Sequence, residues 1–253
     1  MRPRFERFLL SVCLASATFV AMAIDDQVII DTTSERLLVD TCAHLRNATR
    51  FTVDIDSEYE EVLLDGTTVT YHRNDAVLVE RPDKLRLDVV DDRGLRRIFV
   101  NPDNVVVYRP VNDVYAEIEV SGTLDQRLDK LEAKGVVLPL GDLLRTKPCD
   151  DLVEQMRRAT FAGTHYVNGQ MAKHLLIETD HADMQVWIAD GDAPQIVKLV
   201  IHYRELMGEP RFTARLSNWD IATVNDSEFR FSPSPQSERV DFRKPTATWR
   251  GEQ

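Results

Sequence analysis

Apolar and polar residues alternate through residues 182–221, and this pattern predicts three antiparallel strands. Turns are predicted at Asp190-Gly191-Asp192 and around Gly208, because glycine readily adopts positive φ. Each strand then has one apolar face, which something else must cover. The alternating apolar positions are Met184, Val186, Ile188, Val197, Leu199, Ile201, Tyr203, Phe212, Ala214 and Leu216.

The same alternation predicts about eight more strands. Six lie between residues 49 and 120, with a hairpin turn at Asp65-Gly66, and two lie between residues 159 and 178 around Asn168-Gly169. The short connections imply that sequential strands pair in antiparallel fashion. A sheet of about eleven antiparallel strands must curl.

Residues 123–158 interrupt the strand pattern once with leucine-rich helical spacing. Thr123 and Gln126 fit a capping box, and Gly135 is a natural stop for the helix that follows. An apolar connector leads from there to a helical turn at residues 141–144 and a short helix at residues 151–158. We interpret the whole insert as a lid that folds over one face of the sheet.

A further helix is predicted from Thr33 to Ala48, with Asp31 among its N-cap candidates. Taken together, the patterns predict a mainly β fold: an incomplete, curled antiparallel β-barrel of about eleven strands with helices covering its concave face. We expect a single domain over residues 24–242 and an irregular tail over residues 243–253.

The first residues have the features of a cleaved secretory signal. Arg2, Arg4 and Arg7 precede an apolar stretch that ends in Ala21-Met22-Ala23, so we expect cleavage after residue 23. A retained membrane anchor is the alternative. Such a signal predicts a secreted protein.

The acidity of the chain limits its partners. Removing residues 1–23 takes away three arginines and one glutamate, which changes the formal net charge from −11 to −13. A nucleic-acid partner is not expected, because this acidic sequence contains no basic patch with interleaved aromatic residues that could bind the phosphate backbone. We expect a soluble monomer that contacts envelope membranes or an envelope protein only transiently.

Two cysteines, Cys42 and Cys149, remain after the predicted cleavage. In an oxidising compartment such a pair is a candidate disulfide. The alternative is two buried thiols that pack as small apolar groups.

No sequence motif points to catalysis, a metal or a cofactor. The six histidines have no metal-ligand spacing, and neither a nucleophile elbow nor a phosphate-binding loop occurs. The acidic group Glu58, Glu60, Glu61 and Asp65 is interpreted as a solvated hairpin end rather than a carboxylate pair for glycoside hydrolysis. We therefore predict a protein that is not an enzyme.

Several short motifs stand out between about Thr33 and Phe242. They are Arg81-Pro82-Asp83-Lys84-Leu85-Arg86, Leu138-Pro139-Leu140, Val167-Asn168-Gly169, Asp183-Met184-Gln185-Val186-Trp187-Ile188 and Ser217-Asn218-Trp219. In combination they resemble an uncharacterised family of predicted periplasmic proteins, similar in fold to the lipoprotein carriers LolA and LolB. The resemblance implies an incomplete β-barrel closed by helices, secreted to the bacterial periplasm, with a hydrophobic cavity, and it does not imply an enzyme.

These observations lead to two functional hypotheses. The first is a non-enzymatic periplasmic carrier or sensor that binds a hydrophobic ligand, a lipid or a lipoprotein acyl chain, between sheet and lid. The second is an interaction or regulatory module of the envelope without a ligand cavity. For Trp187 and Trp219 the alternative to ligand contact is ordinary core packing. The ligand-binding residues expected under the first hypothesis are Leu128, Leu131, Leu138, Leu143, Leu144, Trp187, Leu199, Ile201, Tyr203 and Trp219.

Overall fold

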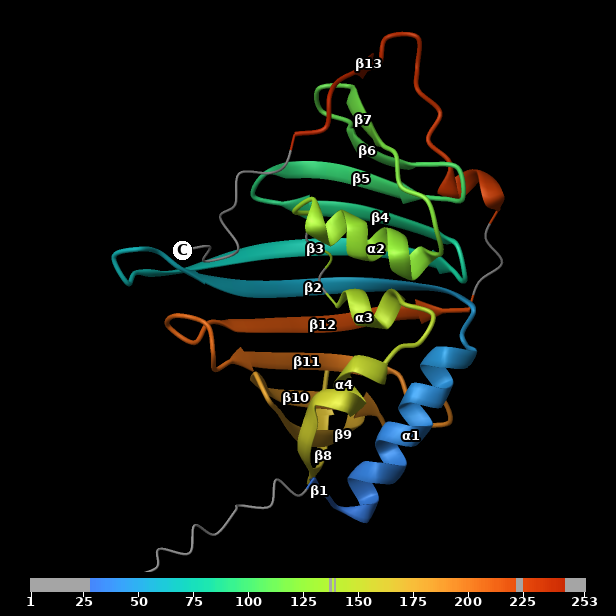
Figure 1. Ribbon diagram of the computed structural model, residues 1–253. Coiled ribbons are helices and arrows are strands. Elements are labelled where there is room, and N and C mark those ends of the chain that lie inside the picture. The colour runs from blue at the N-terminus through green and yellow to red at the C-terminus, as the bar shows by residue number, and fades with distance from the viewer. Residues whose placement is uncertain (1–27, 137, 139, 222–224, 244–253) are drawn as a thin grey trace, which may run out of the picture.

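Thirteen strands form one continuous sheet within the residues that the computed structural model describes, which are 28–136, 138, 140–221 and 225–243 (Figure 1). The predicted signal peptide and all but the first residue of the predicted tail lie outside these residues. In spatial order the strands are β1 (Ile29–Ile30), β8 (Met156–Val167), β9 (Gln170–Thr179), β10 (Ala182–Ala189), β11 (Ile196–Tyr203), β12 (Arg211–Asp220), β2 (Arg50–Val62), β3 (Thr68–Glu80), β4 (Lys84–Asp91), β5 (Gly94–Val100), β6 (Val105–Arg109), β7 (Val114–Ile118) and β13 (Glu238–Arg239).

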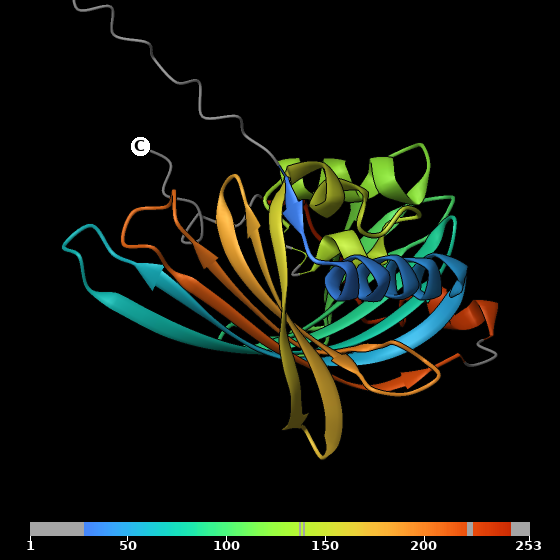
Figure 2. The same ribbon diagram turned by 90° about the horizontal axis from the view of Figure 1, so that it is seen from below.

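The predicted fold class is confirmed: the sheet is curled and open, with helices over its concave face (Figure 2). The antiparallel strands β2–β12 are the predicted eleven. Two short strands, β1 and β13, were not predicted, and they pair in parallel with β8 and β7 at the two edges. Each contains only two residues, which is too few to show an alternating pattern.

Four α-helices cover the concave face: α1 (Thr32–Asn47), α2 (Leu124–Ala133), α3 (Gly141–Leu144) and α4 (Asp150–Gln155). The expected caps are present, since the Asp31 carboxylate accepts hydrogen bonds from the Thr33 and Ser34 amides and Thr123 forms the capping box with Gln126. The helix predicted at residues 151–158 ends earlier, because Met156 already pairs with β9 as the first residue of β8.

The order of the strands explains why the helical insert lies over the sheet. The β2–β7 and β8–β12 meanders join along the β12–β2 pair, so β7 and β8 lie near opposite edges. The chain between them must therefore cross the sheet from edge to edge. Its leucines make crossing on the concave face favourable, and Leu124, Leu128 and Leu131 of α2 are fully buried there.

A buried arginine, Arg81, ties the end of β3 to two helices. Its guanidinium donates to the carbonyl oxygens of Leu45 and Ala48 at the C-terminal end of α1, and of Leu143 in α3. The same group lies 5.2 Å above the centre of the Phe51 ring. Burial lowers the pKa of Arg81 to about 10, which leaves the group charged at neutral pH. One side chain thus fixes α1 and α3 over the same part of the sheet.

A disulfide between Cys42 and Cys149 joins α1 to the residue that precedes α4, with 6.0 Å between the two Cα atoms. The bond spans 107 residues of sequence. It therefore links the first helix covalently to the insert that crosses the sheet.

We expect replacement of both cysteines with alanine to destabilise the protein by about 4–5 kcal/mol, because closing a loop of this length restricts the unfolded chain. Urea unfolding without reductant measures the difference in the free energy of unfolding. As a control, reductant should bring the wild-type protein to the stability of the variant. Equal stability of the two proteins without reductant, with both thiols open to alkylation, would contradict the prediction.

We expect Arg81→Met to lower the free energy of unfolding by about 3–5 kcal/mol, because it leaves three carbonyl groups, which are buried or partly buried, without this donor. The control is Arg97→Met, since Arg97 pairs with Asp88 on the convex face and is 38% exposed; it should cost under about 1 kcal/mol. Urea unfolding of both variants gives the comparison. The role assigned to Arg81 fails if the two costs are alike.

Candidate functional site

A cavity of about 1270 Å³ lies between the concave face of the sheet and the helices. Its floor includes inward-facing residues of β4–β6 and β10–β12, and its roof is formed by α1, α3, α4 and the segments around them. The apolar floor residues are Val89, Ile98, Val107, Met184, Val186, Ile188, Ile196, Leu199, Ile201 and Phe212. The apolar roof residues include Leu38, Val136, Leu138, Leu140, Leu143 and Leu152.

Five residues expected from the sequence to contact a ligand line this cavity. Leu138 and Leu143 lie in the roof, and Leu199, Ile201 and Tyr203 lie on β11. Burial raises the pKa of the Tyr203 phenol, and the nearby charge of Asp142 adds to the effect. Asp142 of α3 and Tyr203 of β11 both line the cavity.

Three other expected residues, Leu128, Leu131 and Leu144, are not among the lining residues. At most 2% of each side chain is exposed, and all three pack in the core shared by the helices and the sheet. They hold the cover in place without reaching the cavity.

The two tryptophans do not line the cavity either. Trp187 lies on the convex face, where its ring stacks on His174 with 4.1 Å between centroids and Lys198 lies 4.4 Å from its centre. Trp219 donates from Nε1 to the carbonyl of Ile196, and its ring packs 5.5 Å from that of Phe51. Both have the packing role that was the alternative to ligand contact.

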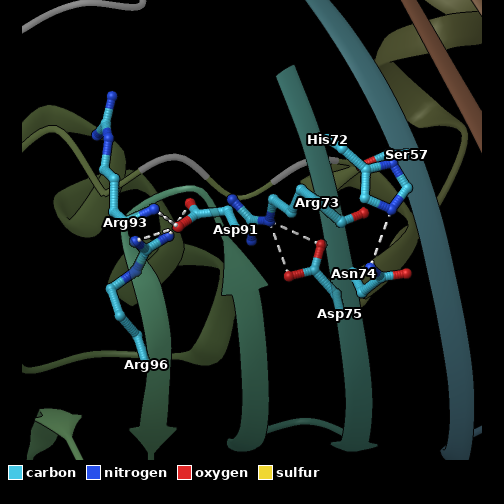
Figure 3. Close-up of polar contacts among 8 residues, drawn as sticks. All are labelled: Ser57, His72, Arg73, Asn74, Asp75, Asp91, Arg93 and Arg96. Carbon is cyan, nitrogen blue, oxygen red and sulfur yellow. Dashed lines mark hydrogen bonds and ion pairs between the residues drawn. The ribbon is translucent and has the colours of Figure 1, made fainter. Parts of the chain in front are cut away.

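One end of the cavity is charged, and this group was missed in the sequence. Arg73 Nε donates to both carboxylate oxygens of Asp75 at 2.8 Å. The guanidinium of Arg96 donates to the two oxygens of Asp91 at 3.0 and 2.6 Å, and the Arg93 amide donates to Asp91 as well (Figure 3). Arg73, Asp91, Arg93 and Arg96 all line the cavity, and we call these four residues with Asp75 the arginine cluster.

The surroundings of the two carboxylates differ. Burial raises the pKa of Asp75, although Arg73 opposes this effect. Burial acts in the same direction on Asp91, but the hydrogen bonds from Arg96 and the Arg93 amide outweigh it and lower its pKa. Tyr59 lies beside the cluster, and burial raises the pKa of its phenol.

A signal for this charged end exists in the sequence. On β3 the inward-facing positions are Val79 and Val77 and then Asp75 and Arg73, all of the same parity. Where the inward positions of a strand change from apolar to charged, the lining of the cavity changes from apolar to charged as well.

Within the described part of the chain, no group of three or more His, Cys, Asp or Glu residues is arranged to hold a metal ion. Nor does any helix there have the length and apolar character needed to cross a membrane.

Comparisons with solved structures find similar folds at low sequence identity. LprF from Mycobacterium bovis is 12% identical, with 77% of this chain and 96% of that chain covered at a TM-score of 0.48. Lipoprotein LppX from Mycobacterium tuberculosis is 14% identical, with 77% and 98% covered at a TM-score of 0.43. A LolA superfamily protein from Nitrosomonas europaea is 12% identical, with 78% and 97% covered at a TM-score of 0.37.

A comparison with curated proteins gives no match. A family model described as "Predicted periplasmic protein (DUF2092)" matches residues 34–243. This match confirms both the family resemblance and the periplasmic localisation predicted from the sequence. The chain therefore belongs to the DUF2092 family of predicted periplasmic proteins.

Proposed function

We propose that this protein is a non-enzymatic periplasmic carrier or sensor that binds a hydrophobic ligand, a lipid or the acyl chain of a lipoprotein, between its sheet and its helices. The observation that carries the proposal is the cavity of about 1270 Å³, whose floor over β10–β12 is apolar. Ligand sites in proteins usually measure about 300–1,000 Å³, so this one has room for an extended ligand. We further propose that the protein binds its ligand as a soluble monomer.

The energetics support a long apolar chain as the ligand. Each methylene removed from water contributes about 0.8 kcal/mol, so about fifteen methylenes contribute about 12 kcal/mol. Association costs about 4–15 kcal/mol in lost freedom. Because the cavity is already formed, the cost of association lies toward the lower end of this range. The binding free energy that remains corresponds to roughly micromolar affinity.

The alternative is an interaction module of the envelope, and this hypothesis predicts that there is no ligand cavity. The cavity therefore favours the carrier or sensor. The two hypotheses also differ in what the purified protein retains. A carrier should release a lipid on extraction, whereas an interaction module should retain a protein partner in a salt-sensitive manner and release no lipid.

We expect protein isolated from the periplasm to contain a bound amphiphile. Native mass spectrometry should show a mass above that of the chain, and solvent extraction should release the same compound. A protein without added mass, combined with no binding of apolar dyes in solution, would contradict the proposal.

We expect Ile201→Glu to weaken binding of a neutral apolar dye by at least about tenfold, because it places a carboxylate on the apolar floor. Ile201 lines the cavity. Val200, the residue before it on β11, packs on the convex face against the small cluster that contains Trp187. Val200→Glu is thus the matched control and should bind the dye as wild type does. Fluorescence titration of both variants, with thermal unfolding as a check of the fold, gives the comparison. Equal losses of dye affinity in the two variants would show that the apolar floor is not part of the binding site.

A further inference from the structure

The floor of the cavity changes from apolar to charged along a single row of paired residues. Across β10, β11, β12, β2, β3 and β4 this row is Val186, Leu199, Ala214, Ser57, Arg73 and Asp91. Three apolar side chains are followed by a hydroxyl, an arginine and an aspartate. In this row the β10–β12 side of the floor is thus suited to a hydrocarbon chain and the side formed by Arg73 and Asp91 to a polar group, while Val89 and Ile98 keep other rows of β4 and β5 apolar.

Stability alone gives a poor account of the arginine cluster. Arg73 and Asp75 are only 5% and 4% exposed, and taking two charges out of water costs several kcal/mol per ion. Well-packed apolar residues in place of a buried ion pair are often neutral or stabilising. The neighbouring rows of the same strands contain such residues, for example Val77, Leu87 and Ile98. A binding role would explain why charge is placed at this end of the floor.

The cluster has an excess of positive charge. It contains three arginines and two aspartates. Seven arginines and six carboxylates line the cavity as a whole, although the formal net charge of the chain is −11. The cavity is therefore opposite in sign to the protein, and its positive charge gathers at one end of an apolar floor.

We propose that the arginine cluster binds the anionic head group, a carboxylate or a phosphate, of an amphiphile whose chain lies on the apolar floor. Arginine suits this role, since a guanidinium has five N–H donors, of which Asp91 takes two from Arg96, and it stays charged at all physiological pH values. The inference rests on the proposed function and specifies the chemical class of its ligand. The phenol of Tyr59, next to Phe212 in the register, lies at the boundary between chain and head group.

The test compares amphiphiles that share a chain and differ in the head group. Hexadecanoate, hexadecyl phosphate and hexadecan-1-ol each compete with a neutral fluorescent dye, and inorganic phosphate alone represents the free anion. We expect both anionic compounds to bind at least about tenfold more tightly than the alcohol, a factor that corresponds to about 1.4 kcal/mol. Inorganic phosphate should not displace the dye.

Two adjacent arginines of β5 provide a matched pair of variants. Arg96 lines the cavity, whereas Arg97 pairs with Asp88 on the convex face. Arg96→Gln should remove most of the preference for the anionic compounds and leave the affinity for hexadecan-1-ol unchanged. Arg97→Gln removes the same charge from the protein and should leave every affinity unchanged. Should Arg96→Gln fail to fold, Arg93→Gln in the exposed β4–β5 turn is expected to reduce the same preference.

Each contrary result has a distinct meaning. Equal affinity for all three amphiphiles, or equal effects of Arg96→Gln and Arg97→Gln, would overturn the head-group assignment and leave the proposed function standing. Displacement of hexadecyl phosphate by inorganic phosphate at matched concentrations would assign the cluster to a free anion instead. No binding of any amphiphile by folded wild-type protein would overturn the proposed function together with this inference.

Discussion

The connection between β7 and β8 is the constraint from which most of this structure follows. These strands lie near opposite edges of the sheet, so the chain that joins them must cross its whole width. A crossing on the convex side would leave the leucines of α2 without a partner. On the concave side the same leucines complete the core, and the curl of the sheet keeps part of the insert away from the floor. The cavity is the space left between a curved floor and a cover that is anchored elsewhere.

The anchors of that cover are polar and lie at the ends of elements. Arg81 joins β3 to α1 and α3 through three carbonyl groups, and Arg127 joins α2 to the carbonyls of Asp83 and Pro102 in two sheet turns. The disulfide adds a covalent link between α1 and the insert. The two arginines bind at the end of the strands where the β3–β4 and β5–β6 turns lie, and Cys42 and Cys149 line the cavity itself. The cover is thus held at its edges, and the apolar residues of β10–β12 still face the cavity.

Local patterns were sufficient to predict the eleven antiparallel strands and the capped starts of α1 and α2, because alternation and capping depend on neighbouring residues. Features that depend on distant residues were not accessible. The parity of Trp187 was visible, but its position on the convex face depends on which side the cover takes. The role of Arg81 was hidden for the same reason, since its acceptors lie 33 to 62 residues away in sequence. The charged end of the cavity had a local sign, the change from Val77 to Asp75 and Arg73, but its meaning required the register of six strands.

That register also gives the site a direction. The period of two that places apolar side chains over β10–β12 places Arg73 and Asp91 in the same row on β3 and β4, so floor and cluster form one continuous surface. A purely apolar ligand would gain no binding free energy from the charged residues, and a small anion would gain none from the apolar residues. Under the proposed head-group assignment, only a molecule with both parts uses the whole row, with its head group toward Arg73 and Asp91 and its chain toward β10–β12. The asymmetry of the floor therefore restricts the possible classes of ligand more than the size of the cavity does.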